Sequence, residues 1–481
     1  MAKALGVDPQ SKAPIPFAID DPQFTRAYFE KLHHPYEAEG IDFWWIDWQQ
    51  DELFDHANLD PLWWLNHLHY FDRKRDARKT PMIFSRWGGL GNHRYPIGFS
   101  GDTYATWQTL AFQPYFTATA ANVNYGWWSH DIGGHMGGEG DAELYVRWVQ
   151  FGVFSPILRL HASSNPYLER RPWGYDAETE RVAISALRLR DTLIPYLQTM
   201  AWRNHAESIP LIRPMYYDYP QDEQAYHCQN QYLFGSELLA APFTSPADPH
   251  TQLSRQVVWL PRGDWFDFFS GNRWPGDGWQ ALHGGLDDIP VFAREGTIIP
   301  LATEVDQSTR HRNQCYELHI FPSADRIFNL LEGYEPQAQG WTRIAHEWQE
   351  EIWTLHISPQ RRQGGFSARQ RTFVICFRGI KPDVIVTAER DSNVLTCGGH
   401  YDPASKAFRL DPIVLDAQSK LTFTLRARRD SLRLEDDRLP GYTHKMLKAF
   451  RLNTDIKRKL ASQLPQIIEM PSRLADYQLA L

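Results

Sequence analysis

Two aspartates stand in settings that suit acid–base or nucleophilic chemistry. Residues 40–50 read GIDFWWIDWQQ and predict a short buried strand, with Asp47 at its C-terminal end between Trp45 and Trp48. A carboxylate among tryptophans is costly unless it is paired or used. Alone, Asp47 fits an N-cap, a buried ion-pair partner or a reactive group. A second carboxylate, Asp102, then follows Phe99 and a Ser-Gly turn.

A pair of carboxylates on neighbouring strands is typical of glycoside hydrolysis. One carboxylate attacks the sugar and forms a glycosyl-enzyme, while the other protonates the leaving oxygen and then deprotonates water. In enzymes that retain the anomeric configuration the two groups lie about 5 Å apart. The settings of Asp47 and Asp102 permit the first to act as the nucleophile and the second as the acid/base.

The elements that must position these groups are strands that alternate with helices. Five apolar runs end in polar or charged residues: Asp47, Arg86, Asp102, Asp131 and His161. Helical patterns separate most of them, at residues 24–33, 58–75, 107–121 and 143–151, and apolar spacings over residues 182–197 predict one further long helix. Active groups at the C-terminal ends of parallel strands indicate a (β/α)8 barrel, here represented by five of eight strands, about strands four to eight.

The chain changes character after about residue 205, where turns become frequent and helices rare. We expect a partial catalytic barrel over residues 1–204 and two β-sandwich-like domains over residues 205–303 and 304–428. Residues 429–481, rich in Lys, Arg and Leu, predict a short helical tail.

The composition excludes several classes of function. The chain has 481 residues and a net charge of −8, and it shows no basic stripe, so nucleic acid is not an expected partner. No apolar run is long enough for a membrane span, and residues 1–12 lack the apolar core of a signal peptide. Phosphate-binding glycine motifs are absent and the four cysteines are widely spaced, so we expect no cofactor. Nineteen tryptophans suit the apolar faces of sugar rings.

Four ordered motifs make the chain resemble glycoside hydrolase family 31. They are WWIDW, then SRWGGLGNHRY with GFSGDT, then SHDIGG, then FSPILRLH. The resemblance implies a retaining α-glycosidase, α-glucosidase-like or α-xylosidase-like, with Asp47 in the nucleophile motif and Asp102 in the acid/base motif. The stretches LFGSELLAAPF, WLPRGDWFDFFSG and PVFAREGTIIP resemble the first C-terminal domain of that family.

The resemblance also implies sugar-binding roles. Arg86 and His161 stand at matching positions, although Arg86 also fits a structural partner of Asp47. Asp131, with His130, fits either sugar contact or the orientation of Arg86. We expect Trp45 and Phe99 to form a wall, whereas Trp48 fits either a wall or a sugar platform. The residues His130, Asp131, His135 and His161 suggest a metal cluster, but the chemistry implied needs no metal and we expect none.

The chain also departs from the family pattern. Trp48-Gln49-Gln50 replaces the usual Met-Asn-Glu, and the tryptophan and asparagine that usually flank the acid/base are absent. Only 46 residues precede Asp47, so the chain resembles the C-terminal part of a longer enzyme, without the β-sandwich and the first barrel strands. The expected function is hydrolysis of an α-glycoside. The alternative is an inactive truncated fragment with at most weak carbohydrate binding.

Overall fold

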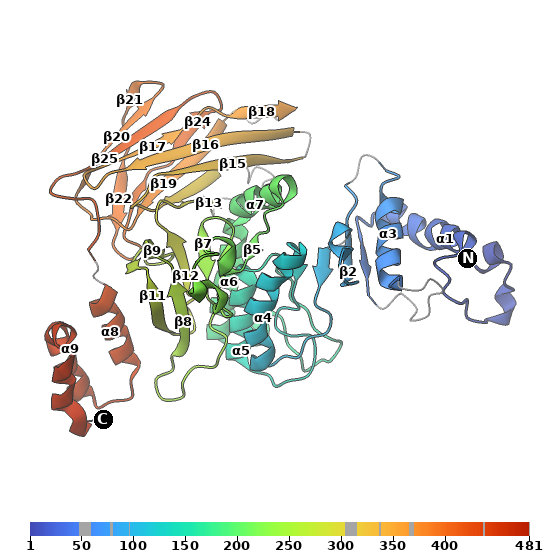
Figure 1. Ribbon diagram of the computed structural model, residues 1–481, viewed down its shortest axis with the longest axis horizontal. Coiled ribbons are helices and arrows are strands. Elements are labelled where there is room, and N and C mark those ends of the chain that lie inside the picture. Colours follow the sequence, from blue (N-terminus) through green and yellow to red (C-terminus); the bar gives the residue numbers. More distant parts are fainter. Residues whose placement is uncertain are drawn as a thin grey trace.

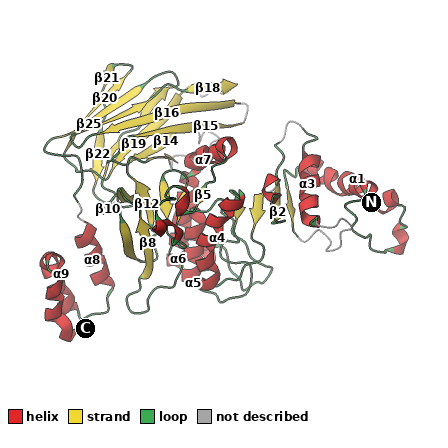
Figure 2. Cartoon of the chain, viewed as in Figure 1, coloured by secondary structure: helices red, strands yellow, loops and turns green. Residues whose placement is uncertain are grey.

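The computed structural model describes residues 1–47, 59–76, 80–95, 97–303, 315–335, 338–364, 370–435 and 438–480. The chain runs from a small N-terminal lobe, through a helical layer and two β regions, to a helical tail (Figure 1). The lobe and the tail lie at opposite ends of the molecule. Between them, most helices lie together near the parallel sheet, and most strands lie in the two β regions (Figure 2).

The first sheet is parallel and has the order β1-β2-β3-β4. Its strands are β1 (Trp44–Ile46), β2 (Ile83–Arg86), β3 (Ile97–Phe99) and β4 (Trp128–Ser129). The expected fifth strand, over residues 155–160, joins the sheet only through two parallel bridges, from Ile157 to Ser129 and from Leu160 to Ile132. Within the described residues, β1 pairs on one side only. The sheet is therefore an open arc of parallel strands, as a partial barrel requires.

The helices around this sheet are α1 (Pro22–Tyr28), α2 (His34–Glu39), α3 (Pro61–Arg73), α4 (Trp107–Ala120), α5 (Ala142–Val153), α6 (Ala177–Thr192) and α7 (Ile194–Glu207). Several start at an aspartate or threonine whose side chain accepts a hydrogen bond from the first turn, as Asp60 does for α3 and Asp141 for α5. The prediction of one long helix over residues 182–197 is wrong. Two helices meet at Leu193, because Pro195 has no N–H for the carbonyl of Asp191.

The next region contains an antiparallel sheet of order β10-β9-β12-β7-β6-β5 and the hairpin β11-β8. Its strands are β5 (Ile212–Arg213), β6 (Tyr232–Phe234), β7 (Leu238–Ala240), β8 (Ser254–Leu260), β9 (Asp264–Asp267), β10 (Arg273–Pro275), β11 (Gly278–Gly284) and β12 (Val291–Arg294). A hydrophobic cluster within this region contains Trp259, Trp265 and Phe292.

The following region is a sandwich of two sheets with buried inner faces. One has the order β13-β14-β19-β23-β22, with β24 also on β19, and the other the order β15-β16-β17-β25-β20-β21, with β18 on β16. The strands are β13 (Ile298–Ala302), β14 (Cys315–Ile320), β15 (Arg326–Glu335), β16 (Ala338–Trp348), β17 (Ile352–Ile357), β18 (Arg361–Gly364), β19 (Gln370–Arg378), β20 (Val384–Arg390), β21 (Asn393–Leu395), β22 (Gly399–Asp402), β23 (Ala407–Leu410), β24 (Ile413–Asp416) and β25 (Leu421–Ala427). Because β13 pairs with β14, the sandwich begins before residue 303.

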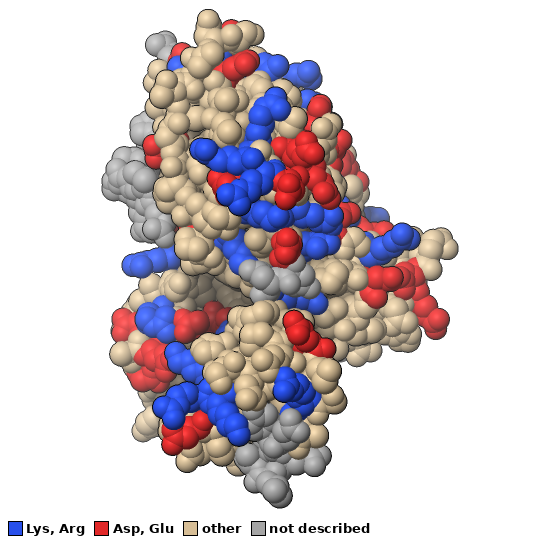
Figure 3. Space-filling model, turned by 90° about the vertical axis from the view of Figure 1, so that its left-hand side faces the viewer, with Lys and Arg blue, Asp and Glu red and all other residues tan. Residues whose placement is uncertain are grey.

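Helices α8 (Arg438–Ala449) and α9 (Thr454–Glu469) form the tail. The Tyr442 hydroxyl lies within hydrogen-bond distance of Nδ1 of His283 on β11, at 3.1 Å, and Lys445 pairs with Asp288. On the face shown in Figure 3, basic and acidic side chains are intermixed, without a continuous basic stripe on that face. None of the described helices combines the length and the apolarity needed to cross a bilayer.

The chain has two separate hydrophobic cores near the parallel sheet. The first belongs to the N-terminal lobe, which we define as the described residues of 1–95, and it contains Ile46, Leu65 and Ile83. The second is the large core of the remaining chain, which runs from Leu110 on α4 through both faces of the sandwich. We call the described residues of 97–435 the body.

Candidate active site

Arg86 joins the two predicted catalytic carboxylates. It is the last residue of β2, and its Nε donates a hydrogen bond to Oδ1 of Asp47 at 2.7 Å, directly after β1. Its Nη2 lies 3.4 Å from Oδ1 of Asp102, beyond β3. Asp47 and Asp102 keep 29% and 35% of their side-chain surface exposed. Both carboxylates therefore meet one guanidinium group at the carboxyl ends of adjacent strands and remain accessible to a ligand.

The residue before Asp102 allows this approach. Gly101 has φ of +77°, which L side chains rarely adopt. A Cβ atom at Gly101 would overlap the Arg86 guanidinium. Glycine is thus required here by conformation and by space together.

An aromatic wall lies on the same face of the sheet. The register pairs Trp45 with Phe84, so these rings share the face that carries Asp47 and Arg86 two residues later. The rings of Trp45, Phe84 and Phe99 lie 5.0 to 5.5 Å apart, and Phe99 is buried while Trp45 is 41% exposed. The Arg159 guanidinium lies over all three rings, at 5.1 to 5.7 Å from their centroids.

Asp131 pairs with Arg159, the residue whose guanidinium lies over the three aromatic rings. Its side chain is 1% exposed and its Oδ1 accepts a hydrogen bond from Nη2 of Arg159. Burial raises the pKa of Asp131, although Arg159 opposes that shift. The neighbouring His130 is fully buried 2.8 Å from Oε1 of Gln113, and burial lowers its pKa to about 3. Asp131 is thus placed to hold Arg159 against the aromatic rings.

Two histidines, His135 and His161, lie beside Trp45 and Asp102. His161 lies 5.3 Å from the ring of Trp45 and stacks on His135 at 4.9 Å. Nε2 of His135 is 3.6 Å from Oδ1 of Asp102. Burial and the nearby Arg159 charge lower the pKa of His161 to about 4, so its imidazole is neutral at pH 7. A neutral imidazole can donate to or accept from a sugar hydroxyl.

The structure brings most predicted site residues into one connected group: Trp45, Asp47, Arg86, Phe99, Asp102, Asp131 and His161. Trp48, together with Gln49 and Gln50, lies outside the described residues. The sequence pattern did not indicate the contacts that Arg159 and His135 make. The signal for Arg159 was its spacing of two from His161, which puts both side chains on one face of an extended segment.

Comparison with known proteins identifies the family of the chain. The model of the TIM-barrel domain of glycosyl hydrolases family 31 matches residues 9–200, and that of the family's C-terminal domain matches residues 208–299. The chain belongs to glycoside hydrolase family 31. All the site residues named above fall within the barrel match.

Relatives span a range of α-glycosidases. An alpha-xylosidase of Saccharolobus solfataricus is 27% identical over 385 residues, which cover 72% of this chain and 51% of that protein. A 1,3-alpha-isomaltosidase of Kribbella flavida is 36% identical over 235 residues, which cover 46% of this chain and 31% of that protein. The chain therefore spans about half or less of the length of these relatives.

Solved structures confirm the fold. A family 31 dextranase of Flavobacterium johnsoniae complexed with glucose superimposes with a TM-score of 0.74 at 23% identity, over 85% of this chain and 56% of that one. An alpha-xylosidase of Xanthomonas citri gives a TM-score of 0.65 at 24% identity, over 85% and 45%. The chain thus has the fold of this family, a TIM-barrel domain followed by a C-terminal domain, and four parallel strands of the barrel sheet lie in its described residues.

Proposed function

We propose that the chain carries the catalytic pair of a retaining α-glycoside hydrolase. The observation that carries the proposal is the single guanidinium of Arg86 in contact with both Asp47 and Asp102. It draws two accessible carboxylates together at the strand ends where barrel enzymes place their chemistry. The names of the relatives, alpha-xylosidase and 1,3-alpha-isomaltosidase among them, support an α-glycoside as the substrate class.

In the first step the Asp47 carboxylate attacks the anomeric carbon while the carboxylic acid of Asp102 protonates the departing glycosidic oxygen. This gives a covalent glycosyl-enzyme and a free alcohol. In the second step the Asp102 carboxylate takes a proton from water, whose oxygen attacks the anomeric carbon and releases Asp47. Two inversions return the starting anomeric configuration.

The remaining residues position the sugar in this proposal. Arg86 orients both carboxylates, and His161, neutral at pH 7, hydrogen-bonds a hydroxyl group of the sugar. The exposed part of Trp45 offers an apolar face beside His161. Phe99 and Phe84 exclude water from behind the reacting groups.

The test is release of nitrophenol from a panel of aryl α-glycosides, comprising glucoside, xyloside, galactoside and N-acetylgalactosaminide. Asp47→Ala should lower kcat by ~10⁴-fold or more, because no other group replaces the nucleophile. Asp42→Ala, an exposed carboxylate that precedes the same strand, is the matched control and should leave kcat unchanged. Proton NMR of the first-formed sugar should show the α-anomer.

Absence of turnover from folded chain on every glycoside would contradict the proposal and support the alternative of an inactive fragment with at most weak carbohydrate binding. Turnover that survives Asp47→Ala would remove Asp47 from the mechanism. Formation of the β-anomer would exclude the double displacement.

A further inference from the structure

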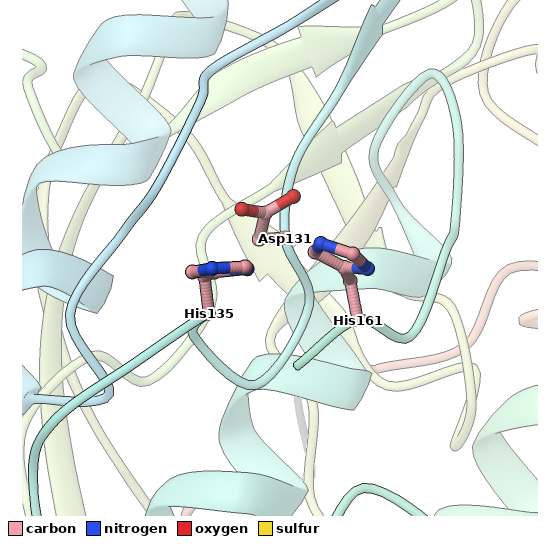
Figure 4. A group of neighbouring side chains, drawn as sticks. All are labelled: Asp131, His135 and His161. Atoms are coloured by element: carbon pink, nitrogen blue, oxygen red, sulfur yellow. The ribbon is translucent and has the colours of Figure 1, made fainter. Parts of the chain in front are cut away.

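Three ligand-type side chains converge beside the carboxylate pair. A carboxylate oxygen of Asp131 and one ring nitrogen each of His135 and His161 lie within 4.8 Å of one another, and Figure 4 shows the three side chains as close neighbours. They come from two consecutive strand ends, since Asp131 and His135 follow β4 and His161 follows the bridged segment 157–160.

Two of these groups lack the hydrogen bonds that their burial demands. Oδ2 of Asp131 and Nδ1 of His135 are buried and have no hydrogen-bond partner within the described part of the chain. Asp131 is fully buried, so an unused oxygen carries a desolvation cost that a bound cation would offset.

The backbone holds the three residues in place. Gly133 and Gly134 turn the chain between Asp131 and His135 with φ of +98° and +83°, and the Gly134 N–H donates to the Asp131 carbonyl at 2.8 Å. The His135 N–H donates to the Thr103 carbonyl at 2.7 Å, and its own carbonyl accepts from the Ser163 N–H at 2.8 Å. Both main-chain groups of His135 are thereby fixed.

His161 is fixed in register with Asp131. The Ile132 N–H donates to the Arg159 carbonyl at 3.1 Å, and Ile132 is bridged to Leu160. Arg159 pairs with Oδ1 of Asp131, and Oδ2 is the oxygen without a hydrogen-bond partner in the described residues, so Arg159 acts as the outer partner that orients a ligating carboxylate.

The electrostatic surroundings tolerate a cation. Three carboxylates, Asp47, Asp102 and Asp131, lie near two guanidinium groups, those of Arg86 and Arg159, which leaves a net negative charge. Two imidazoles and one carboxylate form a donor set that suits Zn²⁺ and related divalent transition ions. Ligand atoms 2.0–2.2 Å from zinc lie roughly 3.5 Å from each other, so binding needs side-chain movements of about 1 Å.

The second cluster of this kind in the described residues is already satisfied. Glu317, His319 and Cys376 also converge, but Nε2 of His319 lies 2.8 Å from the Glu317 carboxylate and Nη1 of Arg378 lies 2.6 Å from Nδ1 of the same ring. Arg409 lies 2.5 Å from Glu317. His319 and Glu317 therefore already have hydrogen-bond and ion-pair partners, and the nearby arginines would repel a cation.

We infer that Asp131, His135 and His161 form a binding site for one divalent transition-metal ion of the zinc class, and that the bound ion inhibits the enzyme. The ion engages His161 and lies beside Asp102, where a sugar would sit. The inhibition rests on the proposed function, whereas the binding does not.

The test is calorimetric titration of Zn²⁺ into the EDTA-treated, dialysed chain, with a parallel titration of Co²⁺ followed by visible absorption. The wild type should bind one ion per chain, and Zn²⁺ should raise its Tm. His135→Phe keeps a ring in the stack but removes a ligand, and should weaken binding more than about tenfold. His250→Phe, an exposed histidine remote from the cluster, is the matched control and should bind like the wild type.

Absence of binding to the wild type, or equal binding by His135→Phe, would overturn the inference. If Cys376→Ser loses binding while His135→Phe retains it, the ion binds at Glu317, His319 and Cys376 instead, and the inference is overturned. Unchanged circular dichroism of each variant shows that it is folded. Hydrolysis is assayed separately in EDTA, so a failed glycosidase test and a failed metal test are distinguished. If both succeed, Zn²⁺ should inhibit the wild type and spare His135→Phe.

Discussion

The N-terminal lobe and the body contribute different halves of one site. Asp47 and Arg86 follow β1 and β2, whose Ile46 and Ile83 belong to the core of the lobe. Asp131 precedes Ile132, which belongs to the core of the body. The halves meet at the pairing of β2 with β3, which spans three residue pairs, at the Arg86 guanidinium, and where Trp45 and Phe84 pack against Phe99 and Arg159. The proposed catalytic pair therefore depends on the docking of two regions that have separate cores.

The largest expected effect separates the chemical roles of the two halves. Asp102→Ala should lower kcat by about 10²- to 10⁴-fold on alkyl or disaccharide α-glycosides, because the leaving oxygen then lacks a proton donor. The loss should be much smaller for nitrophenyl glycosides, whose leaving group departs without protonation. Steady-state rates over a series of leaving groups measure this difference. Equal losses on both kinds of substrate would assign Asp102 another role.

The next prediction tests the independence of the two cores. Leu65 on α3 and Leu110 on α4 are both fully buried, one in each core. Each leucine-to-alanine change should cost about 2–5 kcal/mol of local stability through the lost contacts and the cavity. Hydrogen exchange followed by mass spectrometry should show Leu65→Ala accelerating exchange in residues 1–95 alone, and Leu110→Ala in the body. Identical exchange patterns would show that the regions unfold together.

Weakening the bridge between the halves should have an intermediate effect. Arg86→Lys keeps the charge but replaces a fork with a single ammonium, which cannot hold two carboxylates in the same geometry. We expect kcat/KM to fall about 10- to 100-fold while the unfolding free energy changes by less than about 1 kcal/mol. Arg181→Lys, on an exposed ion pair with Asp287, is the control and should preserve kcat/KM. An unchanged kcat/KM in Arg86→Lys would contradict a bridging role.

The smallest effect is a pH dependence present in both regions. Burial lowers the pKa of His69 in the lobe and lowers that of His130 in the body to about 3. Below pH 6.5 the unfolded chain therefore binds protons that the folded chain rejects, and stability falls as pH decreases from 6.5 toward 4. Each histidine contributes at most ~1.4 kcal/mol per pH unit.

Hydrogen exchange at a series of pH values between 4 and 8 measures this effect in each region. His130→Gln should flatten the pH dependence of the body, and His69→Gln that of the lobe. If the slopes of both regions stay unchanged in these variants, the histidines are not the source of the acid lability.

Much of the fold could be predicted because local patterns and tertiary structure agree. Apolar runs that end in a charged residue located β1 to β4 within a few residues, and the helical patterns over residues 58–75 and 143–151 located α3 and α5. The helix break at Leu193 was missed because the apolar spacing continues across Pro195. The segment over residues 155–160 looked like a strand, but it makes only two bridges to the sheet.

The site was harder to predict where its contacts depend on tertiary geometry. The roles of Asp47 and Asp102 were inferred from their motifs, and both carboxylates do meet Arg86. The stacking of Arg159 over Trp45, Phe84 and Phe99 joins residues up to 114 positions apart in sequence, which no spacing rule detects. The approach of His135 to Asp102 depends on its hydrogen bond to the Thr103 carbonyl.

The glycine before Asp102 has a consequence for which substitutions this protein can accept under selection. A side chain at position 101 would collide with Arg86, and the backbone there is left-handed. Substitutions at the two positions are therefore interdependent, although the positions lie 15 apart in the sequence. A library randomised at position 101 should return glycine almost alone while arginine stays at position 86. In clones that also carry a shorter side chain at 86, asparagine and aspartate should become acceptable at 101, because they tolerate left-handed backbone better than other residues.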